Sequence, residues 1–314
     1  MKPKLVFFGN ERLATGINTT APILKSLITA GYNVAAIVIS QEDALAGAKT
    51  LSAEPLAVAT VAKLHNIPLL VPPKLADARE QLTSYGAAAG ILAAYGKIIP
   101  QSVIDIFPRG IINIHPSLLP AHRGSIPLEA TILAGETQTG VSLMRLVREM
   151  DAGPIYQQAV LPLSGSETKQ DLADKLTALG TSLLINNLPA ILDGSLQPSA
   201  QSENGVSYDQ RLTKDSGRIE TSGWNKPAIQ IERMVRAFAG WPRVRTTLAG
   251  YDIIITAAHS IPATFNGATG ALWLHGREVG VYTQNGILVI DKLIVAGKKE
   301  MPSSAFLAGY KISK

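Results

Sequence analysis

The stretch Ala87–Ala94, with the sequence AAAGILAA, contains no polar side chain. Its length fits one β-strand, and a strand without polar alternation is expected to be buried on both faces. Strands of that kind belong to parallel sheets that carry helices on either side. We therefore predict that Ala87–Ala94 is a central strand of such a sheet.

Apolar runs alternate with helical stretches on both sides of this strand. The other predicted strands are Leu5–Phe8, Val34–Ile39, Pro68–Val71, Ile111–His115 and Thr139–Val147. The predicted helices are Ala21–Ala30, Pro55–His65, Pro100–Ile106 and Leu128–Ala134. This alternation predicts an α/β fold with a Rossmann-like, doubly wound and mostly parallel sheet.

The last third of the chain has a different pattern. Residues 194–207 are rich in Ser, Pro, Gly and Gln, which is typical of a linker. A helix is expected over Lys226–Ala239, followed by short strands that are separated by turns containing glycine. The pattern predicts a large domain over residues 1–193 and a small C-terminal β-barrel of the OB-like kind over residues 208–314.

Composition excludes several classes of protein. Of the 314 residues 46% are hydrophobic and 17% are charged, which excludes a disordered or fibrous chain. Cysteine is absent, so thiol catalysis and disulfides are excluded. No apolar run approaches the ~18 residues of a membrane span, and the first apolar run is too short for a signal peptide. We expect a cytoplasmic protein without a membrane partner.

The positive charge is concentrated in the last third of the chain. Residues 1–204 carry 15 Lys and Arg against 16 Asp and Glu, whereas residues 205–314 carry 14 against 8. Such asymmetry indicates a contact with a polyanion, although a merely basic surface explains the charge equally well.

Asn113 and His115 form the first candidate reaction centre. They are two residues apart at the end of the predicted strand Ile111–His115, so their side chains are expected to share one face of the sheet. Asp151 follows another predicted strand, in a turn with Gly153 and Pro154. An amide and a protonated imidazole can both donate to an oxyanion, and a nearby carboxylate favours the protonated ring. The trio suits acyl transfer without a covalent intermediate on the enzyme.

Taken one at a time, these residues have ordinary structural interpretations. Asn113 could cap a turn, His115 could be a structural hydrogen-bonding group, and Asp151 could be a turn former. We interpret His122 and Arg123 as a solvated turn and expect Glu129 on an exposed helix face. No G-x-S-x-G motif surrounds Ser117, and the five histidines show no metal-binding spacing, so a serine hydrolase and a metal enzyme are disfavoured.

Several motifs, taken in order, resemble the folate-dependent formyltransferase family over essentially the whole chain. They are Ile91–Pro100 (ILAAYGKIIP), Asn113–Pro120 (NIHPSLLP) with Arg123-Gly124, and Met150–Gly153 (MDAG). The tail stretches Arg233–Phe238 with Trp241-Pro242, and Ala296–Met301, are similar to those of family members that act on methionyl-tRNA.

The resemblance implies transfer of the formyl group of 10-formyltetrahydrofolate to the α-amino group of methionine on initiator tRNA. From the basic tail we expect a monomer, and from the spacing of the histidines we expect no metal. Asn113, His115 and Asp151 match the family's catalytic trio. The folate-contacting residues implied by the resemblance are Ser117, Leu118, Leu119 and Pro120 in one turn, and Ile91, Leu92 and Tyr95 around the pteridine ring. Residues 208–314 would then form the tRNA-binding domain.

The chain departs from the family's pattern in two places. Residues 41–49 (QEDALAGAK) lack the arginines that the family usually carries in a loop here, so we expect phosphate contacts to move to the basic C-terminal domain. The first turn, Gly9–Leu13 (GNERL), also differs from the usual Gly-Thr-Pro start.

Other functions share the same trio. A sugar-nucleotide or glycinamide-ribonucleotide formyltransferase would use another acceptor, and a formyltetrahydrofolate hydrolase would use water. A non-catalytic RNA-binding protein is disfavoured, because an aromatic content of 5% does not supply a surface for base stacking.

Overall fold

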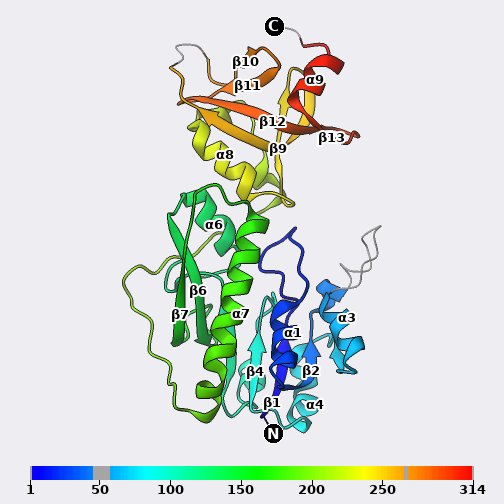
Figure 1. Ribbon diagram of the computed structural model, residues 1–314, viewed down its shortest axis with the longest axis vertical. Helices are drawn as coiled ribbons and strands as arrows, with labels where there is room; N and C mark the ends of the chain where they lie inside the picture. Colours follow the sequence, from blue (N-terminus) through cyan, green and yellow to red (C-terminus); the bar gives the residue numbers. More distant parts are fainter. Residues whose placement is uncertain (1, 45–56, 265–267, 313–314) are drawn as a thin grey trace. The chain divides into compact units, whose positions relative to one another are not determined.

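The computed structural model describes residues 2–44, 57–264 and 268–312 (Figure 1). Their contacts divide the chain into two compact units. The first comprises Met1–Leu128, Thr137–Leu163 and Asp171–Gln210, and the second comprises Glu129–Glu136, Ser164–Gln170 and Arg211–Lys314. The functional domains assigned above to residues 1–193 and 208–314 stay predictions.

The first unit contains a seven-stranded sheet with the strand order β3-β2-β1-β4-β5-β6-β7. The strands are β1 (Lys4–Phe8), β2 (Asn33–Val38), β3 (Leu69–Leu70), β4 (Ala89–Leu92), β5 (Ile111–His115), β6 (Gln138–Arg145) and β7 (Ile155–Pro162). The first five strands in this order are parallel, and β6 and β7 are antiparallel to their neighbours. The predicted doubly wound, mostly parallel sheet is confirmed, and β7 is an edge strand that sequence analysis missed.

Helices cover both faces of this sheet. They are α1 (Pro22–Thr29), α3 (Ala57–Leu64), η1 (Leu75–Ala78), α4 (Arg79–Ser84), α5 (Gln101–Ile104) and α7 (Lys169–Asp193). The helix α6 (Pro127–Ala134) begins at the end of the first unit and lies mostly in the second. On one face, Val6 and Ile111 pack in an apolar cluster with Leu82 and Val103. On the other, Gly180 of α7 lies against Ile114 of β5 and Val141 of β6, and Figure 1 shows the long helix beside β6.

This packing fixes the orientation of the candidate residues on β5. Because side chains alternate along a strand, Asn113 and His115 share the face of Ile111, while Ile114 faces α7. The alternation therefore gives Asn113 and His115 the same face at the carboxyl end of a parallel strand. That end of a doubly wound sheet is where ligands bind.

Gly9 lets the chain turn at the point where the sheet's strand order reverses, between β1 and β4. Asn10 N donates to Ala94 O at 3.2 Å and Glu11 N donates to Ala93 O at 3.1 Å, so the two turns touch through their backbones. Gly9 has a φ of 117°, and a Cβ there would lie 2.0 Å from Ala93 O. Only glycine fits this approach.

The second unit is built on an antiparallel sheet with the order β10-β11-β12-β9-β8, and β13 pairs with β12. Its elements are η2 (Lys214–Gly217), η3 (Thr221–Asn225), α8 (Ala228–Ala237), β8 (Val244–Leu248), β9 (Tyr251–Ile261), β10 (Leu272–His275), β11 (Glu278–Tyr282), β12 (Ile287–Val295), β13 (Glu300–Pro302) and α9 (Ser303–Gly309). The turns at His275-Gly276 and Asn285-Gly286 join antiparallel strands as predicted. The turn at Asn266-Gly267 lies outside the described residues.

The expectation that Glu129 lies on an exposed helix face is wrong. Its side chain is 1% exposed, and Glu129 Oε1 lies 3.3 Å from Lys169 Nζ. Lys169 is fully buried and also donates to Trp241 O at 2.8 Å. A buried charge needs a partner, so the pair belongs to the packing of the second unit.

No helix in residues 2–44, 57–264 and 268–312 is both long enough and apolar enough to cross a membrane.

We expect Gly9→Ala to destabilise the protein by at least about 2 kcal/mol, because the new methyl group collides with the Ala93 carbonyl while the residue also has a strained φ. Gly31→Ala is the matched control, since Gly31 has a φ of 78° and nothing within 4 Å of the added Cβ. It should cost only the ~1–2 kcal/mol of the backbone conformation. Urea denaturation of both variants measures the difference, and equal losses would show that the contact at Ala93 is unimportant.

Candidate active site

The ring of His115 has a partner at each nitrogen. Nε2 lies 2.9 Å from the carbonyl oxygen of His122, which can only accept, so Nε2 carries a hydrogen. Nδ1 lies 3.7 Å from Asp151 Oδ1. That distance suits an ion pair and is too long for a hydrogen bond. A proton on Nδ1 would therefore be stabilised by Asp151 and still be able to reach a bound oxygen.

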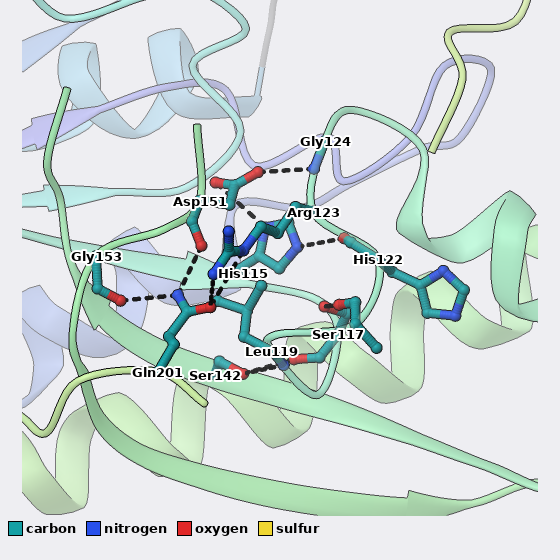
Figure 2. A network of polar contacts seen from close by, with 11 residues as sticks. His115, Ser117, Leu119, His122, Arg123, Gly124, Ser142, Asp151, Gly153 and Gln201 are labelled. Atoms are coloured by element: carbon teal, nitrogen blue, oxygen red, sulfur yellow. Dashed lines mark hydrogen bonds and ion pairs between the residues drawn. The ribbon is translucent and has the colours of Figure 1, made fainter. Parts of the chain in front are cut away.

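Asp151 is held by the turn on the other side of the ring. Gly124 N donates to Asp151 Oδ2 at 2.9 Å (Figure 2). Asp151 has a φ of 49° and His122 has a φ of 58°, so both stand in the left-handed region that most side chains avoid. Two loops with unusual backbone conformations thus bring the carboxylate to His115. Sequence analysis expected this meeting only if the loop folds over the strand end.

Asn113 presents a free amide next to this pair. It lies two residues before His115 on β5, between Leu92 of β4 and Met144 of β6, and it is 6% exposed. Within the described part of the chain its side chain makes no hydrogen bond. The polar atoms of the amide still reach solvent, so a ligand can contact them. The amide therefore suits a bound carbonyl oxygen.

The turn Ser117–Pro120 is fixed by two residues that sequence analysis did not select. Ser142 of β6 accepts a hydrogen bond from Leu119 N at 3.0 Å and donates to Ser117 O at 2.7 Å. Gln158 of β7 donates to Leu119 O at 2.9 Å. No motif signals these contacts, because both residues look like ordinary polar positions in strands.

Ser117 is unsuited to be a nucleophile. Its hydroxyl donates to Ala121 O at 2.7 Å, and His115 has its contacts with His122 and Asp151. A serine nucleophile needs a base that accepts its proton. The geometry therefore gives no support to a serine hydrolase.

The predicted pteridine contacts differ in how far they are exposed. Ile91 is fully buried in β4, and Leu92 at the end of that strand is partly exposed. The Tyr95 ring packs edge-on against Phe8 at 6.0 Å between ring centroids, and burial together with the charge of Asp43 raises the pKa of its hydroxyl. Their contact with folate, like that of the Ser117–Pro120 turn, stays a prediction.

The interpretation of His122 and Arg123 as a solvated turn is wrong. Arg123 is 8% exposed, and its guanidinium donates to Tyr208 Oη at 2.8 Å and to Gln201 Oε1 at 2.7 Å. His122 Nδ1 lies 3.0 Å from Asp209 Oδ1. Their partners come from the middle of the predicted linker and from just beyond it, about 80 residues further along the chain, and no local pattern reveals such pairs.

Residues 41–49 are only partly described. Residues 41–44 are helical, and residues 45–49, with the altered loop and Lys49, lie outside the described residues. Asp43 accepts hydrogen bonds from Asn10 Nδ2 at 2.7 Å and from Ser40 Oγ at 2.6 Å. The start of this segment is therefore tied to the first turn, next to Tyr95.

No three metal-binding side chains gather anywhere in the described ranges of the chain. The arrangement instead offers an unpaired amide donor, a ring that can carry a proton, and a carboxylate beside that ring. These groups can stabilise a negative charge that develops on a carbonyl oxygen.

A second carboxyl group, that of Glu11, lies buried in the first turn. It is 1% exposed, and its two oxygens accept from Ile23 N at 2.9 Å and Leu24 N at 2.8 Å at the start of α1. Burial raises the pKa of Glu11 to about 7, against the lowering effects of these two bonds and of Lys25. Glu11 thus caps a helix from outside it, and its contacts do not extend to the trio.

Comparison with known families gives two matches along the chain. Residues 6–188 match the formyl transferase family, and residues 211–311 match the formyl transferase C-terminal domain. A methionyl-tRNA formyltransferase of Chloroflexus aurantiacus is 38% identical over 98% of this chain and 96% of its own length. One of Pseudomonas putida is 34% identical over 97% of this chain and 93% of its own length.

Solved structures of similar fold have lower identity. An N-formyltransferase of Helicobacter canadensis, crystallised with folinic acid and dTDP-3-aminofucose, matches with a TM-score of 0.67 and 18% identity over 96% of this chain and 100% of its own. HypX of Aquifex aeolicus in complex with tetrahydrofolic acid matches with a TM-score of 0.64 and 18% identity, over 97% of this chain and 46% of its own. At such identity the likeness concerns the fold.

We expect Glu11 to make stability fall as the pH rises from about 4.5 to about 7. The unfolded chain ionises Glu11 near its ordinary pKa of 4.5, whereas the folded protein keeps it protonated up to about 7. The folded state binds the extra proton in this window, so the stabilisation is complete below pH 4.5 and is lost through pH 7. At most, the loss is about 3 kcal/mol.

Glu11→Gln should remove this part of the pH dependence, measured by urea denaturation at pH 5 and pH 7.5. The control is Glu80→Gln, an exposed glutamate in the first turn of α4. A Glu11→Gln protein that lost as much stability over this window as the parent would contradict the assignment.

Proposed function

Since the chain belongs to the formyl transferase family, we propose that it transfers the formyl group of 10-formyltetrahydrofolate to the α-amino group of methionyl initiator tRNA, for translation initiation. The observation that carries this proposal is the pair formed by buried His115 and partly exposed Asp151, which lies beside Asn113, whose amide has no partner in the described chain. Such a group of side chains stabilises an oxyanion and needs no enzyme nucleophile.

Each member of the trio has one role in the proposed reaction. The α-amino nitrogen bonds to the formyl carbon, the bond from that carbon to the donor nitrogen breaks, and the proton lost by the amine ends on that nitrogen. Asn113 donates to the oxygen that becomes negative, and protonated His115 donates to it through Nδ1. Asp151 stabilises the protonated ring and assists removal of the amine proton.

An enzyme nucleophile is unnecessary because the acceptor is itself a good one. An α-amine has an ordinary pKa of about 7.7–8.0, so a substantial part of it is neutral near neutral pH. The protein then has to hold the amine against the formyl carbon and stabilise the charge, and positioning of that kind is worth several orders of magnitude in rate.

The formyl donor fits the same edge of the sheet. The turn Ser117–Pro120 follows β5, and the partly exposed Leu92 ends β4. These two strands are neighbours in the sheet. We assign Ser117, Leu118, Leu119, Pro120, Ile91, Leu92 and Tyr95 to folate binding. The turn is fixed by Ser142 and Gln158, which gives the donor a rigid boundary.

The acceptor is proposed from the relatives and from charge. The two relatives described above carry the name methionyl-tRNA formyltransferase and match over almost the whole chain. Residues 205–314 carry 14 Lys and Arg against 8 Asp and Glu, which favours contact with a polyanion. We further propose that the protein acts as a monomer in the cytoplasm, with initiator tRNA as its macromolecular partner.

A formylation assay with four acceptors tests the proposed function. The parent protein is given 10-formyltetrahydrofolate with methionyl initiator tRNA, a methionyl elongator tRNA, a dTDP-amino sugar, or glycinamide ribonucleotide. Formylation of the initiator tRNA well above the other acceptors supports the proposal. Faster transfer to the sugar or to glycinamide ribonucleotide, or formyl release to water at the same rate without any acceptor, would replace it with one of the alternatives.

We expect Asn113→Ala to lower kcat by about 10²–10³-fold, the usual effect of losing one oxyanion donor, with little change in melting temperature. The amide has no partner in the described chain, so its removal breaks no internal bond.

Asp151→Asn, which keeps an acceptor for Gly124 N, should lower kcat by about 10²-fold or more. His65→Ala, at an exposed histidine, is the control and should have parental kcat. Parental turnover in Asn113→Ala or Asp151→Asn would make the role assigned to that residue wrong.

A further inference from the structure

Residues 199–209, which we call the strap, are hydrogen-bonded to the two loops that contact His115, the loop of Asp151 and the turn that contains His122. At one end, Ser199 exchanges two backbone hydrogen bonds with Ile155, of 2.7 and 2.8 Å, just after the Asp151 loop. At the other end, Arg123 N donates to Ser207 O at 2.9 Å and Asp209 N donates to Arg123 O at 3.0 Å. The strap belongs to the first unit, and most of it lies in the stretch 194–207 that the sequence predicts to be a linker.

Gln201 is the side chain of the strap that reaches the Asp151 loop. Its Nε2 donates to Asp151 O at 2.6 Å and to Gly153 O at 2.8 Å (Figure 2). Its Oε1 accepts from Arg123 Nη2 at 2.7 Å and from Arg123 Nε at 3.2 Å. The amide therefore uses both of its donor hydrogens and both acceptor positions.

The bonds from Arg123 to Gln201 strengthen the bonds from Gln201 to the Asp151 loop. The positive guanidinium of Arg123 on Oε1 polarises the amide, which strengthens its donation to the two carbonyls. One of those carbonyls belongs to Asp151 itself, a non-glycine residue with a φ of 49°. A backbone in that region persists only where its surroundings hold it. Gln201 supplies two of the contacts that do so.

The other loop is held by the same strap. His122 N donates to Ser207 Oγ at 2.8 Å, and the His122 ring lies against Asp209. The carbonyl of His122 is the acceptor for His115 Nε2. The strap thus supports the partner of each ring nitrogen, through Gln201 on one side and through Ser207 and Asp209 on the other.

We propose that Gln201 is a positioning residue for formyl transfer, which fixes Asp151 against His115 by holding the backbone carbonyls of Asp151 and Gly153. This inference rests on the proposed function, because it requires the His115–Asp151 pair to act in the reaction. Gln201 itself touches no reacting atom. Its effect is on the distance and direction between the carboxylate and the ring, to which turnover is steeply sensitive.

Gln201→Glu is the most informative variant, because it separates the two halves of the amide. The carboxylate keeps the size of the side chain, and one of its oxygens still accepts from Arg123. The other oxygen replaces Nε2 and faces the carbonyls of Asp151 and Gly153, which can only accept. The contact with Arg123 should survive and the contacts with the Asp151 loop should be lost. Gln201→Met removes all four bonds and adds no charge.

A matched control lies in the same segment. Gln197 Nε2 donates to Gly194 O at 2.7 Å at an exposed position, so Gln197→Glu makes the same chemical change without touching the Asp151 loop. We expect parental turnover, stability and exchange from this variant.

The variants are compared by steady-state formylation of methionyl initiator tRNA, by melting temperature, and by amide hydrogen exchange without substrates. For Gln201→Glu and Gln201→Met we expect kcat to fall by about 10–100-fold with KM for either substrate changed by less than about 3-fold. The peptide that covers residues 148–154 should exchange faster, and the strands β4 and β5 should exchange as in the parent.

Three results would overturn the proposal. In the first, both Gln201 variants keep parental kcat. In the second, kcat falls but amide exchange becomes faster throughout the sheet. In the third, both variants are unfolded. The last two would make Gln201 a general structural brace. If the parent formylates none of the acceptors, the proposed function fails, while the exchange of residues 148–154 still decides whether Gln201 holds that loop.

Discussion

Both nitrogens of the His115 ring have partners from the chain, and the rest of the site is arranged around that constraint. Nε2 donates to the backbone of the 116–124 turn, and Nδ1 faces a carboxylate from the loop after β6. A ring held on two sides has one orientation, so neither loop can move without changing it. Ser142 and Gln158 fix the turn from the sheet side, and the strap fixes it from the other side. A site that must stabilise charge benefits from such rigidity, because its dipoles then need no reorganisation during the reaction.

Two carboxyl groups of the first unit, those of Glu11 and Asp151, have different surroundings. Glu11 has the strongly raised pKa, and its oxygens are occupied by the backbone of α1. Asp151 keeps one oxygen near an ionisable ring and is partly exposed, with 15% of its side chain accessible. A perturbed pKa alone would select Glu11 as a candidate functional residue, whereas its contacts are those of a helix cap and the contacts of Asp151 fit the proposed role. Burial can shift the pKa of a structural cap, so a shifted pKa does not by itself identify a functional residue.

The trio and the choice of acceptor are separate properties of the chain. In the proposed mechanism Asn113, His115 and Asp151 act on any amine that reaches the formyl carbon, so they do not distinguish a tRNA from an amino sugar. The features that favour tRNA lie in the relatives and in the positive charge of residues 205–314. This separation explains how enzymes of one fold can share a reaction and differ in the molecule that receives the group.

The sequence by itself determined the elements whose signal is local. The strand Ile111–His115, the order of the strands up to β6, and the hairpins at His275-Gly276 and Asn285-Gly286 follow from apolar periodicity and turn residues, which act over a few neighbours. It also determined that Asn113 and His115 share a face, since alternation is a property of any strand. The short helices η1 and α4 were not predicted. The helix α7 was missed because Gly180 and Pro189 interrupt its pattern, and Glu129 was misplaced because its partner Lys169 is distant in sequence. Only the tertiary structure decided that Asp151 lies beside His115 and that Gln201 holds the loop that contains Asp151. Those contacts join residues tens of positions apart through loops in rare backbone conformations, and periodicity carries no information about where such loops meet.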